Sequence, residues 1–547
     1  MKKLPLYLIF SGFILGIFAP LAGMMLRVGH ETESDFIDQE NRPPSHLDSS
    51  ALSVKSLLTD RSPLETAFND HYSFRRMLIS GYALTAWHLF RSPINPQNCQ
   101  IGQNDYLFLS DNHAQVFSQH AGSVPIPEEI LTKTEQHQDA LKKWCAQRRI
   151  IYLCVVPPDK HSIYPEYLPR WVLTPNQNLF IDKLTDQIKD KDLVLNLKPA
   201  LLKAKSLQQD KLYPKWDTHW NDLGAFEGYK ALMQKLSSLS DTPLKQMESV
   251  EYRRKETAKG NDLSKMSKTQ GFIKDIAVEF VKNIPREGLS AITYEGEKIT
   301  PVPFYIKPTD NTLVENKNAL NKKTLVIFRD SFSTAWAPLL YATFEKTLFI
   351  GADIEPPDLK DWIDENRPDF LVCERVERHT LSQLSSILSQ LTTPGMTRKE
   401  LNAYIQNHID RTTTLPLAHT EHFTATQCTL SEQENNLVIH TNSSDPFLEL
   451  PDFQELHASP AREVIVQIDL TTPQHTTTQL FYQTETNNTF QEEYSQRNPH
   501  PKGRHILSFY LTANSRITKL RLDPGETAGT YHLHKMTITP VDQKTNQ

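Results

Sequence analysis

Between residues 131 and 391, short apolar runs alternate with amphipathic segments. The apolar runs predict strands at 150–158, 192–197, 324–328, 347–351 and 369–376. The amphipathic segments predict helices at 135–149, 178–191, 224–238, 333–344, 358–367 and 380–391. This alternation indicates βαβ units on a parallel sheet, and the wholly apolar runs suit strands buried on both faces. The stretch from about 240 to 320 is expected to be an irregular insertion.

Outside this region the pattern changes twice. Residues 61–90 place apolar groups every three to four positions, which predicts helix, and residues 99–110 predict a short strand pair. From 422 to 541 helical periodicity disappears, and seven short alternating runs are separated by Pro, Gly and Asn turns. This last region is predicted to be an all-β jelly-roll sandwich.

The N-terminus begins with two lysines, and residues 4–26 then run for 23 positions without a charge. As a helix this segment spans roughly 35 Å, enough to cross a bilayer. A cleavable signal peptide is the alternative, but Ala19 and Ala22 form no clean cleavage motif, so an uncleaved anchor is favoured. Lys2 and Lys3 place the N-terminus in the cytoplasm. The rest of the chain is then expected to lie on the far side of the membrane, as a single-pass protein.

Together these patterns divide the chain into consecutive parts. The predicted parts are an anchor (1–27), a stalk (28–60), an α/β domain (61–398), a linker (399–420) and a β-sandwich (421–547). A chain of 547 residues is long enough for two or three domains.

Charge and cysteine content exclude some functions. The net charge is −6 and there is no dense basic run, so nucleic acid is not an expected partner. Five cysteines are spread along the chain without a C-x-x-C pair, which argues against a zinc site. Their odd number leaves at least one free thiol unless cysteines pair between chains.

Ser331 follows the predicted strand 324–328 and precedes a helix. Open parallel sheets bind ligands beyond the carboxyl ends of their strands, so this hydroxyl is placed where a nucleophile would be. Its N–H would lie near a helix N-terminus and could stabilise an oxyanion. The alternative is that Asp330 or Ser331 only caps the helix.

A serine nucleophile needs a base, and His219 is the candidate. It lies just before a predicted helix, with Asp217 two residues upstream, and a histidine oriented by a carboxylate can activate a hydroxyl. Alternatively, His219 caps its own helix. A metal role would need two further ligands, and none is adjacent. The loop 155–169, rich in Asp, Lys, His and Tyr, could line the same cleft or could be only a Pro-structured loop.

Several motifs between about residues 38 and 385 together resemble the alginate O-acetyltransferase family of SGNH-hydrolase-like periplasmic proteins. They are KWDTHWNDLGA, FRDSFS, VVPPDKHSIYPEYLP, FNDHYSFRRMLI, ENRPP and GNDLSKM. Members of this family carry a permuted SGNH-like domain in which Asp-x-His precedes the catalytic serine. The G-x-S-x-G elbow of the α/β-hydrolases is absent.

The resemblance implies roles for named residues. Ser331 would be the nucleophile, His219 the base and Asp217 its orienting carboxylate. Arg329, which stands in the place of the SGNH glycine, is expected to bind substrate together with Lys160, Tyr164 and Trp220. No role is assigned to Asp262, because Asn261 interrupts the usual Gly-Asp-Leu of the family. No cofactor and no metal are expected.

The resemblance also implies a location, a reaction and partners. The expected location is the bacterial inner membrane, single-pass, with the catalytic domain in the periplasm. The chain would transfer acetyl groups to hydroxyls of an exported bacterial polysaccharide through an acyl-serine, with the acetyl donor supplied by a polytopic membrane-bound O-acyltransferase. One alternative is a carbohydrate esterase that uses the same residues with water. Another is a non-catalytic, anchored glycan-binding protein. The sandwich resembles modules of bacterial surface-glycan proteins, and its aromatic residues Tyr482, Phe490 and Tyr494 could stack on sugars or belong to its core.

Overall fold

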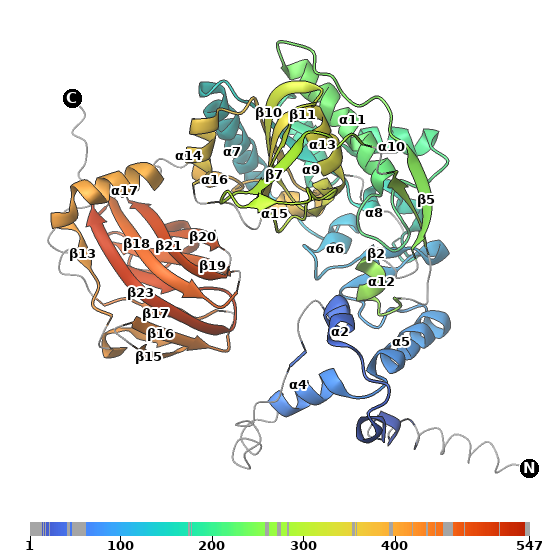
Figure 1. Cartoon of the computed structure of the whole chain (residues 1–547), viewed down its shortest axis with the longest axis horizontal. Helices are drawn as coiled ribbons and strands as arrows, with labels where there is room; N and C mark the ends of the chain where they lie inside the picture. The colour runs from blue at the N-terminus through green and yellow to red at the C-terminus, as the bar shows by residue number, and fades with distance from the viewer. Residues whose placement is uncertain are drawn as a thin grey trace, which may run out of the picture.

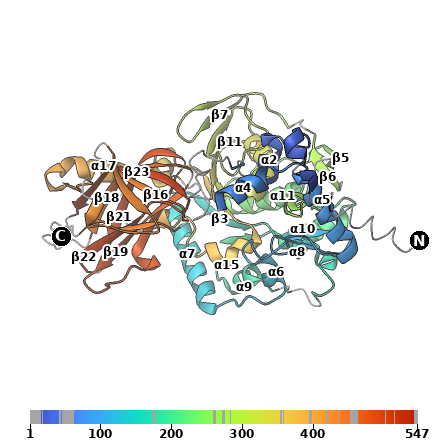
Figure 2. The ribbon, with the colours of Figure 1, turned by 90° about the horizontal axis from the view of Figure 1, so that it is seen from below.

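The computed structural model contains an α/β domain and a β-sandwich, which lie beside each other in both ribbon views (Figures 1 and 2). The described residues are 14, 16, 18–20, 22–40, 44–45, 62–172, 176, 178–257, 262–270, 275–281, 284–352, 356, 358–392, 398–417, 420–433, 436–443, 445–451, 463–474, 476–500, 502–513 and 515–541. Among these residues no helix is both long and apolar enough to cross a bilayer. Most of the predicted anchor and the second half of the predicted stalk lie outside them.

An eight-stranded sheet forms the centre of the α/β domain. Its strands, in order across the sheet, are β4 (Val194–Asn196), β3 (Ile151–Val156), β12 (Phe370–Glu374), β10 (Asn321–Arg329), β11 (Phe344–Gly351), β9 (Thr312–Asn316), β7 (Leu289–Thr293) and β8 (Lys298–Ile299). The first five are parallel, as the alternation of strands and helices predicted. The last three are antiparallel, so the sheet is mixed and the prediction of a parallel sheet holds only for its first five strands.

The three antiparallel strands correct the expectation of an irregular insertion at 240–320. Their sequences are short and half-exposed, as the alternating burial along β9 shows, so they lack the apolar runs that marked the other strands. The same region contains the hairpin of β5 (Tyr252–Thr257) and β6 (Asp275–Phe280) and the short helix α12 (Asp262–Met266).

Helices cover both faces of the sheet. On one face lie α10 (Lys198–Leu207), α11 (Asp222–Leu239) and α13 (Ala337–Thr343); on the other lie α7 (Glu128–Gln147), α9 (Phe180–Gln187), α14 (Leu359–Asn366), α15 (Thr380–Gln383) and α16 (Ser389–Thr392). Along β10, Leu325 and Ile327 enter the first core, whereas Val326 and Phe328 enter the second. The apolar run 325–328 of β10 is therefore buried on both faces. Helix α10 has no counterpart in the sequence prediction, and the helix predicted at 380–391 is two short helices.

The N-terminal region packs at the lower edge of the α/β domain in Figure 1. Its elements are α2 (Glu33–Glu40), α4 (Ser62–His71), α5 (Arg75–Thr85), a π-helical turn (Ala86–Phe90), β1 (Cys99–Ile101), β2 (Leu107–Leu109) and α6 (Val116–His120). Helix α8 (Lys160–Ile163) follows β3 and belongs to the α/β domain. Strands β1 and β2 form the predicted antiparallel pair. The predicted helical segment is divided at Phe74, which adopts a left-handed backbone conformation.

Two sheets face each other in the C-terminal sandwich. One has the order β15 (Thr429–Gln433), β16 (Asn436–Thr441), β23 (Gly529–Pro540), β18 (Glu463–Thr472) and β21 (Gly503–Thr512), with β13 (Thr413–Thr414) also pairing with β23; the other has the order β14 (Thr424–Thr426), β17 (Phe447–Glu449), β22 (Ile517–Asp523), β19 (Thr476–Thr484) and β20 (Ser495–His500). A common apolar core lies between them. The prediction of a β-rich C-terminal region is confirmed.

The predicted linker, residues 399–420, is part of the sandwich. Helix α17 (Arg398–Asn407) buries Leu401 and Ile405 against Ile465 and Val541, and β13 pairs with the central strand β23. The five cysteines all lie in the described part of the chain, and all are free thiols.

The start of α11 depends on a close backbone contact. A Cβ at Gly224 would lie 2.6 Å from the Leu212 carbonyl oxygen and 2.9 Å from Trp220 Cβ. We expect Gly224→Ala to destabilise the protein by roughly 1–3 kcal/mol, because the backbone must move to relieve the overlap. Denaturant unfolding monitored by fluorescence measures this change.

Gly81→Ala is the matched control. Gly81 lies within α5, and no atom lies within 4 Å of the position its Cβ would take. A helical Gly→Ala change without overlap stabilises by about 0.5–1 kcal/mol. Equal unfolding free energies for the two variants would contradict the role assigned to this contact.

Candidate active site

The loop that leads into α11 carries Asp217 and His219. Asn221 caps the helix, its side-chain oxygen accepting the Gly224 N–H at 3.0 Å. Before the cap the chain turns tightly, because the His219 N–H donates to Asp217 Oδ1 at 2.9 Å. The same carboxylate oxygen lies 2.9 Å from His219 Nδ1. The short Asp-x-His spacing therefore fixes both the backbone and the imidazole.

Ser331 reaches this histidine from the carboxyl end of β10. Ser331 Oγ lies 2.8 Å from His219 Nε2, although the two residues are 112 positions apart in sequence. The structure thus brings the three predicted catalytic side chains into one hydrogen-bonded chain, from Asp217 through His219 to Ser331. About 30% of the His219 side chain is exposed, which leaves the serine–histidine pair open to an incoming substrate.

Asp330 caps the helical segment that begins at Ser331. Asp330 Oδ1 accepts the Phe332 N–H at 2.9 Å, and Oδ2 accepts the Val376 N–H at 2.8 Å. Its own N–H donates to Glu374 Oε2 at 3.0 Å. Asp330 therefore fulfils the capping role that was the alternative for this position, and Ser331 is left free to face His219.

A second carboxylate, missed by the sequence analysis, lies beside the histidine. Asp262 Oδ2 is 3.5 Å from His219 Nδ1. Asp262 also accepts the Thr218 N–H at 2.9 Å and the Thr218 hydroxyl hydrogen. Burial, reinforced by the neighbouring Asp217 charge, raises the pKa of Asp262 to about 6. The only sequence signal was the motif GNDLSKM, whose inserted Asn261 argued against a role.

Two carboxylates on the Nδ1 side alter the basicity of the imidazole. Burial by itself lowers the pKa of His219, but the hydrogen bond to Asp217 and the charges of Asp217 and Asp262 outweigh burial and raise it above 6.5. The pKa of Asp217 is lowered: burial opposes ionisation, but the bond from His219 prevails. The arrangement therefore favours an imidazole that accepts a proton readily at Nε2.

The four residues predicted to bind substrate have other partners. Lys160 is buried, and its Nζ donates to the carbonyl oxygens of Lys215 at 2.9 Å and Asp217 at 2.7 Å. Burial lowers the pKa of this ammonium group to about 8. Lys160 therefore fixes the backbone of the Asp217 loop.

The side chains of Tyr164 and Trp220 also form hydrogen bonds to backbone groups. The buried Tyr164 hydroxyl accepts the Leu212 N–H at 2.9 Å, and the Trp220 indole N–H donates to the Phe332 carbonyl oxygen at 2.9 Å. The second of these bonds joins the histidine loop directly to the serine segment.

Arg329 is fully buried, and its Nη2 donates to the Ile306 and Lys307 carbonyl oxygens at 3.0 and 2.6 Å. Burial lowers the pKa of its guanidinium group to about 10. The substrate-binding prediction for Lys160, Tyr164, Trp220 and Arg329 is therefore corrected. Each of the four side chains is buried and donates to or accepts from backbone atoms, and sequence pattern alone does not distinguish that arrangement from a cleft-facing one.

Within the described part of the chain, two clusters have the donor atoms that metal ions use. One is Asp217, His219 and Asp262, where both carboxylates face Nδ1 and Nε2 faces the serine. The other is the buried set His120, Asp159 and Glu377. In the second, Asp159 Oδ1 lies 2.5 Å from Arg378 Nη1, so a cation already neutralises it. Burial raises the pKa of Glu377 to about 8, which favours the neutral acid at pH 7.

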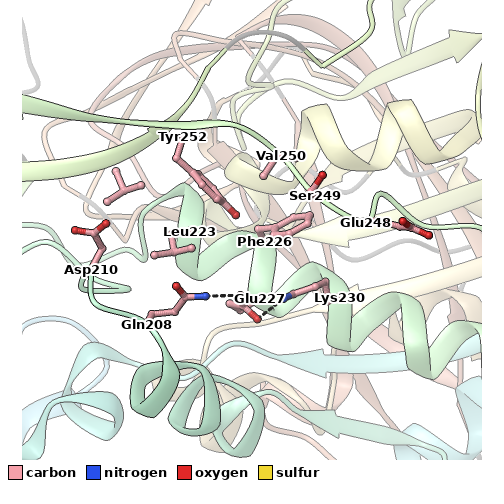
Figure 3. Close-up of a pocket in the computed structure, with 11 residues that line it drawn as sticks. Gln208, Asp210, Leu223, Phe226, Glu227, Lys230, Glu248, Ser249, Val250 and Tyr252 are labelled. Atoms are coloured by element: carbon pink, nitrogen blue, oxygen red, sulfur yellow. Dashed lines mark hydrogen bonds and ion pairs between the residues drawn. The ribbon is translucent and has the colours of Figure 1, made fainter.

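A separate hollow of about 240 Å³ lies along α11 (Figure 3). Within it Glu227 pairs with Lys230 at 2.7 Å and accepts the Gln208 amide hydrogen at 3.2 Å. Asp217, His219 and Ser331 do not line it. The candidate active site is therefore the serine–histidine pair and not this hollow.

Comparison with known proteins gives one family match. Residues 99–287 match the family model of the SGNH hydrolase-like domain of the acetyltransferase AlgX. This segment contains Asp217, His219 and Asp262, whereas Ser331 lies beyond it. None of the curated proteins matches the chain.

Similarity to solved structures is remote. Pseudomonas aeruginosa AlgX has 11% identity and a TM-score of 0.43, over 81% of this chain and 95% of AlgX. The O-acetyltransferase domain of Pseudomonas putida AlgJ has 16% identity and a TM-score of 0.34, over 54% of this chain and 98% of that domain. The C-terminal CBM6 of LamC from Zobellia galactanivorans has 7% identity and a TM-score of 0.18, over 23% of this chain and 98% of that module.

At such identities and TM-scores these structures assign neither a reaction nor a substrate. The family match, in contrast, covers the loop with the Asp-x-His motif, Asp217 and His219. The resemblance to the alginate O-acetyltransferases is therefore confirmed over residues 99–287, which match the SGNH hydrolase-like acetyltransferase domain of AlgX.

Proposed function

We propose that this chain is a polysaccharide O-acetyltransferase that works through an acetyl-serine intermediate on Ser331. One observation carries the proposal: His219 Nε2 lies 2.8 Å from Ser331 Oγ while Asp217 holds the opposite ring nitrogen at 2.9 Å. This is the geometry in which a histidine can act as general base toward a serine hydroxyl. The match of residues 99–287 to an acetyltransferase domain supports acetyl as the group transferred.

In the first half-reaction Ser331 Oγ attacks the acetyl carbonyl carbon of the donor, and His219 Nε2 takes the serine proton. The bond from the acetyl carbon to the donor then breaks, and His219 returns the proton to the departing group. The products are acetyl-serine and the deacetylated donor. Ser331 opens a helical segment, so its N–H lacks an intrahelical acceptor and can face the developing oxyanion.

In the second half-reaction a sugar hydroxyl attacks the acetyl-serine. His219 removes the hydroxyl proton, the ester bond to Ser331 breaks, and the proton passes to Ser331 Oγ. The acetyl group ends on the sugar oxygen and the serine is regenerated. We extend the proposal to an exported bacterial polysaccharide as acceptor and to a polytopic membrane-bound O-acyltransferase as the source of the donor. The uncharged segment 4–26 supports an inner-membrane anchor and a periplasmic site.

Replacing Ser331 tests the nucleophile. We expect Ser331→Ala to lower acetyl transfer from an activated acetyl ester to an oligosaccharide by on the order of 10³-fold or more. Ser333→Ala, which removes a neighbouring buried hydroxyl, is the control and should retain transfer. Chromatography of the acetylated oligosaccharide measures the product. Retained transfer in Ser331→Ala would contradict the proposal.

The same assay separates transferase from esterase. Acetate release with no acetylated sugar would show that water is the acceptor. If neither product forms with the wild-type protein, although the donor and acceptor are present, a non-catalytic role is favoured.

The raised pKa of His219 makes the reaction sensitive to pH. Only the neutral imidazole accepts the serine proton, so we expect the rate to fall as the pH drops below a pKa higher than 6.5. Asp217→Asn removes the group that raises this pKa most. In the pH–rate profile, this change should move the acidic limb to lower pH and reduce the plateau rate by about 10²–10⁴-fold. An unchanged profile would contradict the assigned orientation of His219.

Asp262→Asn tests the second carboxylate as a positioning residue. It removes a charge 3.5 Å from His219 Nδ1 but leaves the Asp217 bond. We expect the acidic limb of the pH–rate profile to move to lower pH, because the Asp262 charge helps to raise the His219 pKa, and the plateau rate to fall by only about tenfold. A pH–rate profile with an unmoved limb would show that Asp262 supports only the fold of its loop.

A further inference from the structure

The five-stranded sheet of the sandwich carries a groove on the face turned away from the core. Along β19, Leu480 and Tyr482 are in the core, so Gln479 and Phe481 project to the other face. The neighbouring strand β22 repeats this alternation and contributes Arg521 and Asp523 to the outer face. A hollow of about 630 Å³ lies over these residues, within the range of small-ligand sites. Figure 2 labels both strands.

The floor of the groove is a fixed aromatic–guanidinium stack. The Arg521 guanidinium carbon lies 3.8 Å from the Phe447 ring centroid and 4.7 Å from that of Phe481. Both carboxylate oxygens of Asp523 bind the same guanidinium, at 2.8 and 2.6 Å. Arg521 is thus held flat, and its charge is compensated by Asp523. Phe490 contributes a half-buried ring to the lining.

The rim of the groove consists of polar groups. Gln479 Nε2 donates to Glu492 Oε2 at 2.9 Å. Arg497 lies 3.4 Å from Glu492 and 3.6 Å from Glu526. Carboxylate and amide oxygens near aromatic rings can hold a sugar. The sugar hydroxyls donate hydrogen bonds to the oxygens, and the apolar face of the sugar ring packs on the aromatic side chain.

The charge of the lining limits which sugar fits. Four carboxylates and two guanidinium groups line the groove. Both arginines pair with those carboxylates, so a negative ligand meets compensated cations and a net negative wall. Burial raises the pKa of Asp523; the hydrogen bond to Arg521 and its charge oppose this rise, and the charges of Asp445 and Glu492 add to it. A polyuronate would add to this repulsion, whereas an uncharged sugar would not.

We propose that this groove binds an uncharged, hydroxyl-rich glycan strand and excludes polyuronates. Identifying that strand as the acceptor rests on the proposed acetyltransferase function; the binding itself does not. The groove would hold the polymer to the protein and raise the local concentration of acceptor hydroxyls. Because the lining is negative, the acceptor that we expect for this chain is uncharged and therefore differs from alginate, which is a polyuronate.

Affinity electrophoresis of the full chain tests the ligand class. The gels contain hydroxyethyl cellulose, galactomannan or dextran as neutral probes, or polymannuronate. We expect retardation in at least one neutral gel and none in polymannuronate, and Phe490→Ala should weaken the retardation about tenfold or more. Retardation by polymannuronate, with or without retardation by a neutral polymer, would overturn the proposal, and so would retardation by none of the four polymers.

A charge reversal provides the sharper test. Asp445→Lys with Glu526→Lys changes the sign of the groove's formal charge and should create binding to polymannuronate. The control, Asp410→Lys with Glu432→Lys, makes the same change in net charge at two exposed positions outside the groove. Equal polymannuronate binding by both double variants would show that the effect comes from net charge, and it would overturn the proposal that the groove is the binding site.

Ser331→Ala should bind each polymer as the wild type does. A protein that binds neutral glycan but transfers no acetyl group would contradict the proposed reaction alone. One that transfers acetyl but binds no neutral glycan would contradict the groove alone.

Discussion

The 2.8 Å contact between His219 Nε2 and Ser331 Oγ is the constraint on which the site depends, because its partners come from loops 112 residues apart. The serine is fixed at the end of β10, which pairs in parallel with β11 and β12. The histidine loop is fixed at the start of α11. The Trp220 indole, bonded to the Phe332 carbonyl oxygen, joins the two loops. The hydrogen bond to Ser331 is therefore supported from both sides.

Buried charges supply much of this support. Lys160, Arg329 and Asp330 each place a charged group in or near the core and bind backbone atoms of the loops around the site. Burying a charged group away from water costs free energy, and the hydrogen bonds that these groups form to backbone atoms compensate for that cost. Removing any of them would leave backbone groups without partners. These residues set the geometry of the site without facing substrate.

The sequence pattern predicted the framework well where burial was complete. Each of the five parallel strands contains a short apolar run, so their positions were evident. The Asp-x-His and Arg-Asp-Ser motifs located the three side chains that the structure brings together. The antiparallel strands β9, β7 and β8 were missed because half-exposed strands lack continuous apolar runs. Asp262 was missed because its approach to His219 depends on how α12 packs, which local pattern does not encode.

Local sequence pattern does not encode tertiary packing, and this also explains why Lys160, Tyr164, Trp220 and Arg329 were wrongly expected to bind substrate. Polar side chains next to a catalytic motif can face the cleft or the backbone, and burial decides between the two. In the sandwich, the alternating pattern identified strands correctly, but Tyr482 belongs to the core and Phe490 to the groove. Which aromatic residues are available to a ligand depends on sheet pairing as well as on composition.

Covalent capture of the acetyl group tests the central claim most directly. The full chain is mixed with p-nitrophenyl acetate, quenched in acid within one turnover and digested, and the peptides are sequenced by mass spectrometry. The account predicts one acetyl group on Ser331, and its loss when an acceptor oligosaccharide is added before the quench. An acetyl group on another residue that is transferred to the acceptor while Ser331 stays unmodified would contradict the account.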